Sequence, residues 1–169
     1  MTPMLRSAKR PLYQETGGVV LPLNMASEYM GRMEARLRDT LRKPGVQINR
    51  IGTDIVVILV RPSFMYTDKP EISQMGDELL GRLARVLREF DMTWVEITGF
   101  TDAMQNQTHA IALSKDMADR VGVYLARNRV HPIRMFLVGM GSANPIADQS
   151  QVGRLTNLRV EIRLSAIVQ

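Results

Sequence analysis

One stretch of the chain places polar side chains where binding chemistry could occur. Residues 99–121, GFTDAMQNQTHAIALSKDMADRV, run from the end of an apolar strand through a polar turn into a predicted helix, and Asp102 stands at the mouth of that turn. A carboxylate only accepts hydrogen bonds, so Asp102 can either cap the helix through backbone N–H groups or bind a cationic ligand group, and both roles stay open. Met117 extends the apolar face of the helix and is therefore expected to pack. That face comprises Ala110, Leu113, Met117, Ala118, Val121 and Leu125.

The sequence lacks the usual signatures of catalysis. His109 and His131 have no cysteine or clustered acid at ligand spacing, so no metal site is expected. A Gly-x-Ser-x-Gly turn and a Gly-x-x-x-x-Gly-Lys loop are both missing, and Asn144 stands where a dinucleotide-binding fingerprint needs its third glycine. We therefore expect a non-enzymatic protein without cofactor, although an acid pair assembled only by folding stays open.

The composition is that of one folded domain. Its 169 residues fit a single core, and 45% hydrophobic residues are too many for a disordered chain. The net charge of +5 would suit nucleic acid, an acidic polymer, an anionic membrane or an acidic partner protein. Nucleic acid is disfavoured because few aromatic residues are interleaved with the scattered Lys and Arg. The absence of cysteine excludes disulfides, thiolate metal sites and a lipid-bearing cysteine within this sequence.

Membrane and export signals are not apparent in the sequence. The longest apolar run, residues 55–60, is far below the ~20 residues that a membrane helix needs. The apolar patch at residues 19–23 is shorter than the roughly 7–15 residues of a secretory signal. We expect either a cytoplasmic chain or one whose targeting segment was removed, with membrane attachment only through an anchor that this sequence does not contain.

The N-terminal part of the chain predicts an arm and a helix. Residues 1–23 hold three prolines and a Gly-Gly pair without periodicity, which predicts an irregular arm. Residues 24–45 predict an amphipathic helix with Asn24 as N-cap and an end at Pro44-Gly45. Its methionine-rich stripe fits packing on the core better than docking of a partner, although both stay open. The stripe comprises Met25, Tyr29, Met33, Leu37 and Leu41.

Residues 46–169 predict one α+β domain. A hairpin over residues 46–60 with a central second strand is followed by a helix over 71–90, on whose apolar face Met75 falls. A strand at 93–98 and the helix after Asp102 come next. MFLVGMG and RVEIRL then supply two more strands. This β-α-β-α-β-β order favours a mixed sheet with helices covering one or both faces.

Several spaced motifs occur together in the second half of the chain. They are Gly99-x-Thr101-Asp102, Leu113-Ser114-x-x-x-Ala118, Gly139-x-Gly141, Pro145-x-Ala147 and Gly153-Arg154-x-x-Asn157-x-Arg159-Val160-Glu161-Ile162. With these motifs, about residues 46–166 resemble the C-terminal domain family of OmpA, the peptidoglycan-associated outer-membrane proteins. The resemblance implies a four-stranded mixed sheet, a periplasmic location in a Gram-negative bacterium with outer-membrane association, and a site for the diaminopimelate of peptidoglycan stem peptides.

The implied site has a simple physical logic. Diaminopimelate carries an ammonium beside a carboxylate, which an Asp and the planar fork of an Arg can pair. The family's Asp aligns with Asp102, and its Arg, 117 − 102 = 15 residues further on, is Met117 here. The family's His, Asn and first Arg are likewise replaced, by Phe100, Ala110 and Leu158. Loss of the fork costs about 2–5 kcal/mol, so we expect weakened binding.

A relocated cation could compensate for the lost arginine, and two functions follow from the two outcomes. The first is a domain that tethers an envelope or outer-membrane assembly to peptidoglycan through an altered site. The second is a structural subunit of an envelope-spanning secretion machine that binds proteins, with OmpA-like accessory subunits of Dot/Icm-type type IV secretion systems as an analogy. The candidate ligand-binding residues are Thr101, Asp102, Arg120, Arg154, Asn157 and Arg159.

Overall fold

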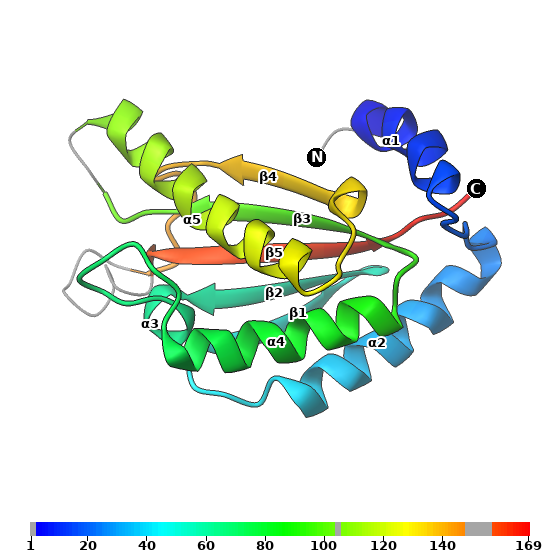
Figure 1. The fold of residues 1–169 in the computed structure, drawn as a ribbon, viewed down its shortest axis with the longest axis horizontal. Helices are drawn as coiled ribbons and strands as arrows, with labels where there is room; N and C mark the ends of the chain where they lie inside the picture. The colour runs from blue at the N-terminus through cyan, green and yellow to red at the C-terminus, as the bar shows by residue number, and fades with distance from the viewer. Residues whose placement is uncertain (1–2, 104–105, 148–156) are drawn as a thin grey trace.

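The computed structural model describes residues 3–103, 106–147 and 157–169 and contains one five-stranded sheet with helices around it (Figure 1). The predicted α+β class and mixed sheet are confirmed. The predicted β-α-β-α-β-β order and the implied four strands are short by one strand, because both strands of the hairpin at residues 46–60 belong to the sheet. The strands are β1 (Val46–Ile51), β2 (Asp54–Val60), β3 (Thr93–Phe100), β4 (Met135–Gly139) and β5 (Arg159–Ala166). The α-helices are α1 (Pro3–Glu15), α2 (Ala26–Thr40), α3 (Arg61–Phe64), α4 (Gln74–Glu89) and α5 (Gln107–Arg127), with 3-10 turns at Leu23–Met25 and Pro132–Arg134.

The sheet is mixed, with strand order β1-β2-β5-β3-β4. Only β3 and β4 pair in parallel, and α5 makes the crossover between them. The last strand, β5, lies between β2 and β3 and is antiparallel to both. As predicted, β2 is an interior strand, and the turn that joins it to β1 contains Gly52 at φ +61°. The C-terminal ends of β3 and β4 therefore meet the start of β5 at one end of the sheet.

The main core lies between one face of the sheet and the helices α2, α4 and α5. Along β3 and β5 some buried residues alternate with partly exposed ones, whereas the five middle residues of β2 are all buried, as expected for an interior strand. The methionine-rich stripe of α2 faces this core, because Tyr29, Met33 and Leu37 are buried in it, so the packing interpretation is confirmed. Its first member, Met25, lies outside α2 and is exposed. Other core residues include Ile55, Val57, Leu59, Leu80, Leu83, Leu87, Val95, Ile97, Val121, Leu125, Ile162 and Leu164.

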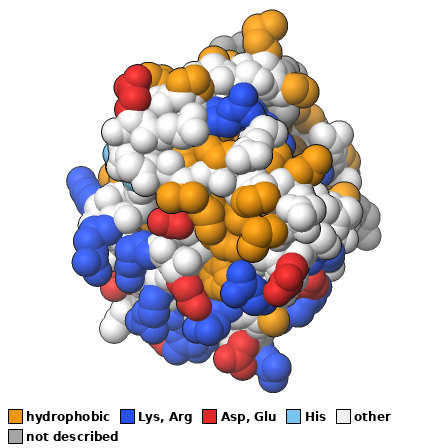
Figure 2. Space-filling view, turned by 90° about the vertical axis from the view of Figure 1, so that its right-hand side faces the viewer, with side chains coloured by type: hydrophobic (Ala, Val, Ile, Leu, Met, Phe, Trp, Pro, Cys, Tyr) orange, Lys and Arg blue, Asp and Glu red, His pale blue; other side chains and the backbone are white. Residues whose placement is uncertain are grey.

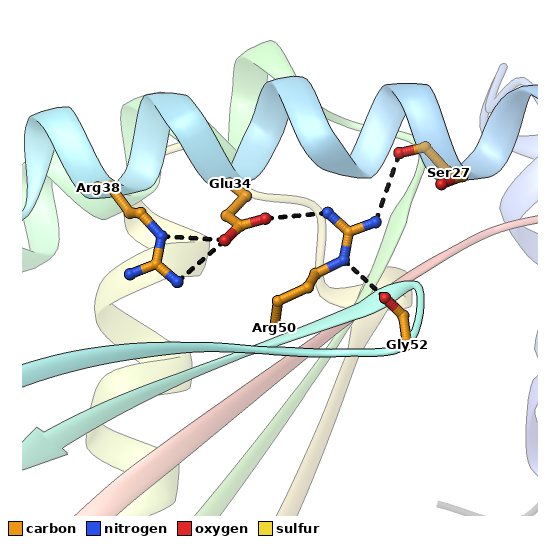
Figure 3. A network of polar contacts seen from close by, with 5 residues as sticks. All are labelled: Ser27, Glu34, Arg38, Arg50 and Gly52. Atoms are coloured by element: carbon orange, nitrogen blue, oxygen red, sulfur yellow. Dashed lines mark hydrogen bonds and ion pairs between the residues drawn. The ribbon is translucent and has the colours of Figure 1, made fainter.

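A polar network fastens α2 to the β1–β2 hairpin (Figure 3). The Glu34 carboxylate accepts hydrogen bonds from Arg38 Nε and Arg50 Nη1, both at 3.0 Å. Arg50 also donates to the carbonyl oxygens of Ser27 and Gly52. The hydrogen bond from Arg38 is the main reason why the pKa of Glu34 lies below its ordinary value, and Arg50 adds to the effect.

The irregular arm predicted for residues 1–23 is wrong, because Pro3–Glu15 form the helix α1. The helix contains Pro11, which removes one backbone hydrogen bond. Side-chain contacts with the rest of the chain hold α1 in place. Tyr13 packs with Trp94, Phe136 and Ile167 in a small second core. Its hydroxyl donates to the Val19 and Asp91 carbonyls.

Two helix boundaries also differ from prediction. Helix α2 begins at Ala26 after a 3-10 turn, and neither Asn24 nor Met25 caps it with a side chain, so the predicted Asn24 cap is wrong. It ends at Thr40, before Pro44-Gly45, because Leu41 already leaves the helical conformation. Helix α4 begins at Gln74 with the Ser73 hydroxyl as cap. Met75, in its first turn, is 63% exposed and not on the core face.

No helix in the described part of the chain is both long and apolar enough to cross a bilayer.

Candidate functional site

The candidate site lies where the ends of β3 and β4, the start of α5 and the start of β5 come together (Figure 1). Two motif glycines let the α5 backbone touch the strands directly. A Cβ atom on Gly99 would lie 1.9 Å from the Ser114 carbonyl oxygen, and one on Gly139 would lie 2.5 Å from Lys115 N. Because any side chain at these positions would force α5 away, the glycines fix the distance between α5 and the strand ends.

Ser114 joins the strand ends to α5. Its hydroxyl donates to the Ile111 carbonyl and accepts from Gly141 N, both at 2.8 Å. Gly141 has φ +61°, which favours glycine, and its carbonyl accepts from Thr101 N at 2.7 Å. The Thr101 hydroxyl oxygen is buried and has no hydrogen-bond partner within the described residues. The backbone of Thr101 is therefore held in place, whereas its hydroxyl oxygen, on the residue before Asp102, has no described partner.

Asp102 is partly buried at the mouth of the turn. The cap of α5 is Asn106, whose side-chain oxygen accepts from His109 N at 3.1 Å, so the capping role considered for Asp102 is wrong. Its carboxylate forms no hydrogen bond or ion pair with residues 3–103, 106–147 or 157–169. The carboxylate thus has no described function in holding the fold.

Met117, at the position that the resemblance assigns to an arginine, is a buried core residue. Met117 is only 1% exposed and belongs to the main hydrophobic core, which confirms its predicted packing role. Phe100 and Ala110, which also replace polar family residues, are buried as well. Leu158 is partly buried, and its carbonyl accepts from Arg61 N. Three of the four substituted positions have become buried apolar sites.

Arg159 and Asn157 hold the loop that follows β4 through hydrogen bonds to its backbone. Arg159 is fully buried with its guanidinium against the Phe100 ring, and it donates to the Asn157 and Asn144 carbonyls at 3.1 and 2.7 Å. It also pairs with Glu161 at 3.6 Å. Burial lowers the pKa of Arg159, and Glu161 opposes this shift. Only its Nε is buried without a described partner.

The Asn157 side chain binds the backbone of the same loop at two residues. Its oxygen accepts from the backbone N–H groups of Ile146 and Ala147 at 2.8 and 3.0 Å, and its amide donates to the Ala147 carbonyl at 3.1 Å. All of these partners belong to the protein itself, so the amide has little left to offer a ligand.

Arg120, another predicted ligand-binding residue, pairs with an acid of its own helix. Its Nε donates to Asp116 at 2.8 Å. Its side chain lines a groove of about 430 Å³ between α4 and α5, together with Ile72 and Tyr124. Arg120 therefore makes no ion pair with Asp102 in the part of the chain that is described. Arg154 lies outside the described residues.

Sequence reasoning missed Arg61, a buried cation near this end of the sheet. Its guanidinium donates to the Tyr66 and Lys69 carbonyls at 3.0 and 3.2 Å. Burial lowers its pKa, whereas the nearby Asp116 carboxylate acts in the opposite direction. Its place directly after the buried strand β2 was the available signal, because an arginine there must find partners within the fold.

The two histidines are surface residues, as expected. His109 and His131 are exposed, and His131 Nδ1 accepts from Ile133 N at 3.1 Å. The described residues contain no cluster of three or more histidine or acidic side chains that could hold a metal ion.

Sequence relatives of the chain include a lipoprotein, an outer membrane protein and a peptidoglycan-binding protein. It is 34% identical over 140 residues to the probable lipoprotein YiaD of Escherichia coli, covering 82% of this chain and 64% of that protein. It is 31% identical over 109 residues to outer membrane protein A of Bordetella avium, covering 64% of this chain and 56% of the relative. A third relative, the peptidoglycan-binding protein ArfA of Mycobacterium tuberculosis, is 38% identical over 50% of the chain and 26% of its own length. The chain thus spans less than two thirds of each of these relatives.

Solved structures share the fold. A MotB-like protein from Desulfovibrio vulgaris superposes with a TM-score of 0.74 at 18% identity, covering 85% of this chain and 93% of that one. The cell wall anchor of the type VI secretion system of Pseudomonas aeruginosa gives 0.69 at 24% identity, covering 80% and 97%. Residues 65–155 match the OmpA family. This match takes in more than half of the chain, including β3, α5 and the loop after β4, and the chain therefore belongs to the OmpA family.

Proposed function

We propose that this chain is a non-enzymatic periplasmic domain that links an envelope or outer-membrane assembly to peptidoglycan through a weakened diaminopimelate site. The proposal rests on one observation, the absence of a described partner for the Asp102 carboxylate. The fold keeps this carboxylate at the mouth of the turn without a described partner, while Met117 fills the arginine position. The acidic partner for a zwitterionic ligand is therefore available, and the basic partner is missing.

The weakening follows from the chemistry of the ligand. Asp102 can pair with the ammonium of diaminopimelate, but the adjacent carboxylate of the ligand meets an apolar surface. Leaving one charge of such a pair unmatched costs about 2–5 kcal/mol, and about 1.4 kcal/mol corresponds to a factor of ten in affinity. Binding to the wall is thus at least about tenfold weaker than in a domain with the arginine in place. The name of the relative ArfA, a peptidoglycan-binding protein, supports the class of ligand.

Sedimentation with purified diaminopimelate-type sacculi tests this function. We expect a small fraction of the wild-type protein to sediment with the sacculi and Asp102→Ala to abolish this retention. Asp39→Ala is the matched control, because Asp39 is an exposed aspartate on α2 without an ion pair in the described structure. Equal retention of wild type and Asp102→Ala would contradict the proposal.

A second candidate is a structural subunit of an envelope-spanning secretion machine, with the Dot/Icm-type type IV system as the analogy. The burial of Phe100, Ala110 and Met117 favours it, since these substitutions exchange binding polarity for core stability. This function predicts no retention on sacculi and co-purification of the domain with other envelope proteins from its host.

A further inference from the structure

Helix α1 is turned with its basic side toward the protein and its apolar side toward solvent. Arg6, Lys9, Arg10 and Tyr13 recur at spacings of three and four residues and face the sheet. The opposite stripe carries Met4, Leu5, Ala8, Pro11 and Leu12, all exposed, and ends at Glu15. Met4 is 79% exposed and Leu12 is 49% exposed. A surface helix of a globular protein normally has the reverse orientation.

The three cations of α1 have no acidic partner among the described residues. Arg6 donates to the Ser165 hydroxyl, Lys9 to the Met135 carbonyl at 2.7 Å, and Arg10 to the Val168 carbonyl. These acceptors are neutral, and none of the three cations forms an ion pair with a described residue. Residues 3–14 contain no acid, so this part of α1 carries a charge of +3 beside its exposed apolar stripe, and Glu15 follows at the end of the helix.

The apolar surface continues beyond α1. Val19, Leu23 and Met25, in the segment that leads to α2, are also exposed. Figure 2 views the end of the molecule that holds α1 and the C-terminus, and it shows apolar side chains gathered across this end with basic side chains among and below them. The candidate wall site lies at the other end of β3, whose eight residues span roughly 26 Å.

We propose that the outer face of α1 docks on an anionic lipid surface. Apolar residues on one side and Lys or Arg on the other are the features of helices that lie in a membrane interface. An anionic surface also complements the +3 charge of residues 3–14, which an apolar protein groove or a second basic copy of the chain would not do. The apolar side chains insert between headgroups, while Arg6, Lys9 and Arg10 lie within electrostatic range of the phosphates. This inference does not depend on the proposed wall site.

Flotation of the full chain with vesicles tests the proposal. The probe vesicles contain phosphatidylglycerol and phosphatidylethanolamine, and the comparison vesicles contain phosphatidylcholine only. We expect the wild type to float with the anionic vesicles and to bind the neutral ones at least about tenfold more weakly, since cations near an anionic surface add to the affinity. Met4→Ser/Leu12→Ser should reduce binding to the anionic vesicles by about tenfold or more, because two apolar insertions are lost.

The control is Ile111→Ser/Val123→Ser on α5, which removes two exposed apolar side chains away from α1; their exposures, 49% and 47%, are close to that of Leu12. It should float like the wild type, and circular dichroism should show that both double variants are folded. The proposal is overturned if the wild type does not float with anionic vesicles, or if both double variants lose binding equally. It is also overturned if sedimentation equilibrium shows a dimer that Met4→Ser/Leu12→Ser dissociates, because the face would then bind a second copy.

Discussion

Phe100 lies against the guanidinium of Arg159, with the Arg159 Cζ atom 4.1 Å from the centre of the ring. Phe100 stands where the OmpA-like pattern has a histidine, two residues before Asp102. The ring and the carbonyls of Asn144 and Asn157 together hold the buried guanidinium in place. Arg159, the arginine nearest in sequence to Asn157, therefore stabilises the fold through these contacts.

Replacing the ring tests how much this stacking contributes. We expect Phe100→Leu to lower the free energy of unfolding by about 1–2 kcal/mol, because it removes a buried cation–π contact while keeping an apolar side chain. Urea denaturation measures the change. Phe90→Leu is a suitable control, since Phe90 is also buried but has only the Tyr29 ring as aromatic neighbour. Equal stability of Phe100→Leu and wild type would show that the contact is unimportant.

Asn157 is predicted to hold the loop that follows β4. Asn157→Ala removes three hydrogen bonds, and we expect it to cost about 2–4 kcal/mol because partly buried backbone groups lose their partners. The specific readout is hydrogen exchange at the amides of Ile146 and Ala147, which should lose protection relative to the amides of β3. Unchanged protection at both amides would contradict this role.

Gly99 and Gly31 should respond in opposite directions to a methyl group. Gly99→Ala places its Cβ against the Ser114 carbonyl, so we expect a loss of about 1–3 kcal/mol through overpacking. Gly31→Ala, within α2, meets nothing closer than 3.9 Å and should stabilise the protein by up to about 1 kcal/mol through helix propensity. Thermal unfolding of the two variants makes the comparison. A similar melting temperature for both would show that α5 does not need its close approach to β3.

The Glu34 network predicts a pH dependence of stability. The folded-state pKa of Glu34 lies below the ordinary value of 4.5, so its contribution is present above that value and is lost as the pH falls through the folded pKa. We expect Glu34→Gln to lower the free energy of unfolding by about 1 kcal/mol at pH 7, because these ion pairs are partly exposed. The difference from wild type should shrink below pH 4.5. A difference that grows on acidification would contradict the assignment.

Much of the fold could be predicted from the sequence, because local patterns and packing agree there. The β-branched run of β2 and the helical period of α5 each indicate one structure, and the structure has it. Helix α1 could not be predicted in this way. Its prolines argue against a helix, and only contacts with distant residues such as Trp94 and Ser165 stabilise it. Met75 fits the helical period but falls in the exposed first turn of α4, where that period does not decide burial.

The candidate site was predictable in part. Motif spacing placed Asp102 in the turn before α5 and Met117 on the core face of α5, and the structure has both residues there, because the glycines that set the α5–β3 approach are local features of the sequence. The contacts of Arg159 were not predictable, since its partners come from loop geometry, whereas the i,i+4 spacing of Asp116 and Arg120 on α5 already indicates their ion pair. Arg61 was missed because its partners, the Tyr66 and Lys69 carbonyls, carry no side-chain signature.

The central claim is that the loss of one arginine, and not a loss of the whole site, limits binding of the peptidoglycan stem peptide. The most direct measurement is titration of wild type, Met117→Arg and Met117→Arg/Asp102→Ala with a soluble muropeptide that contains diaminopimelate, followed by NMR of the Thr101 and Asp102 amides. We predict that Met117→Arg binds at least about tenfold more tightly than wild type and that Asp102→Ala removes this gain. If folded Met117→Arg binds no better than wild type, the claim is contradicted.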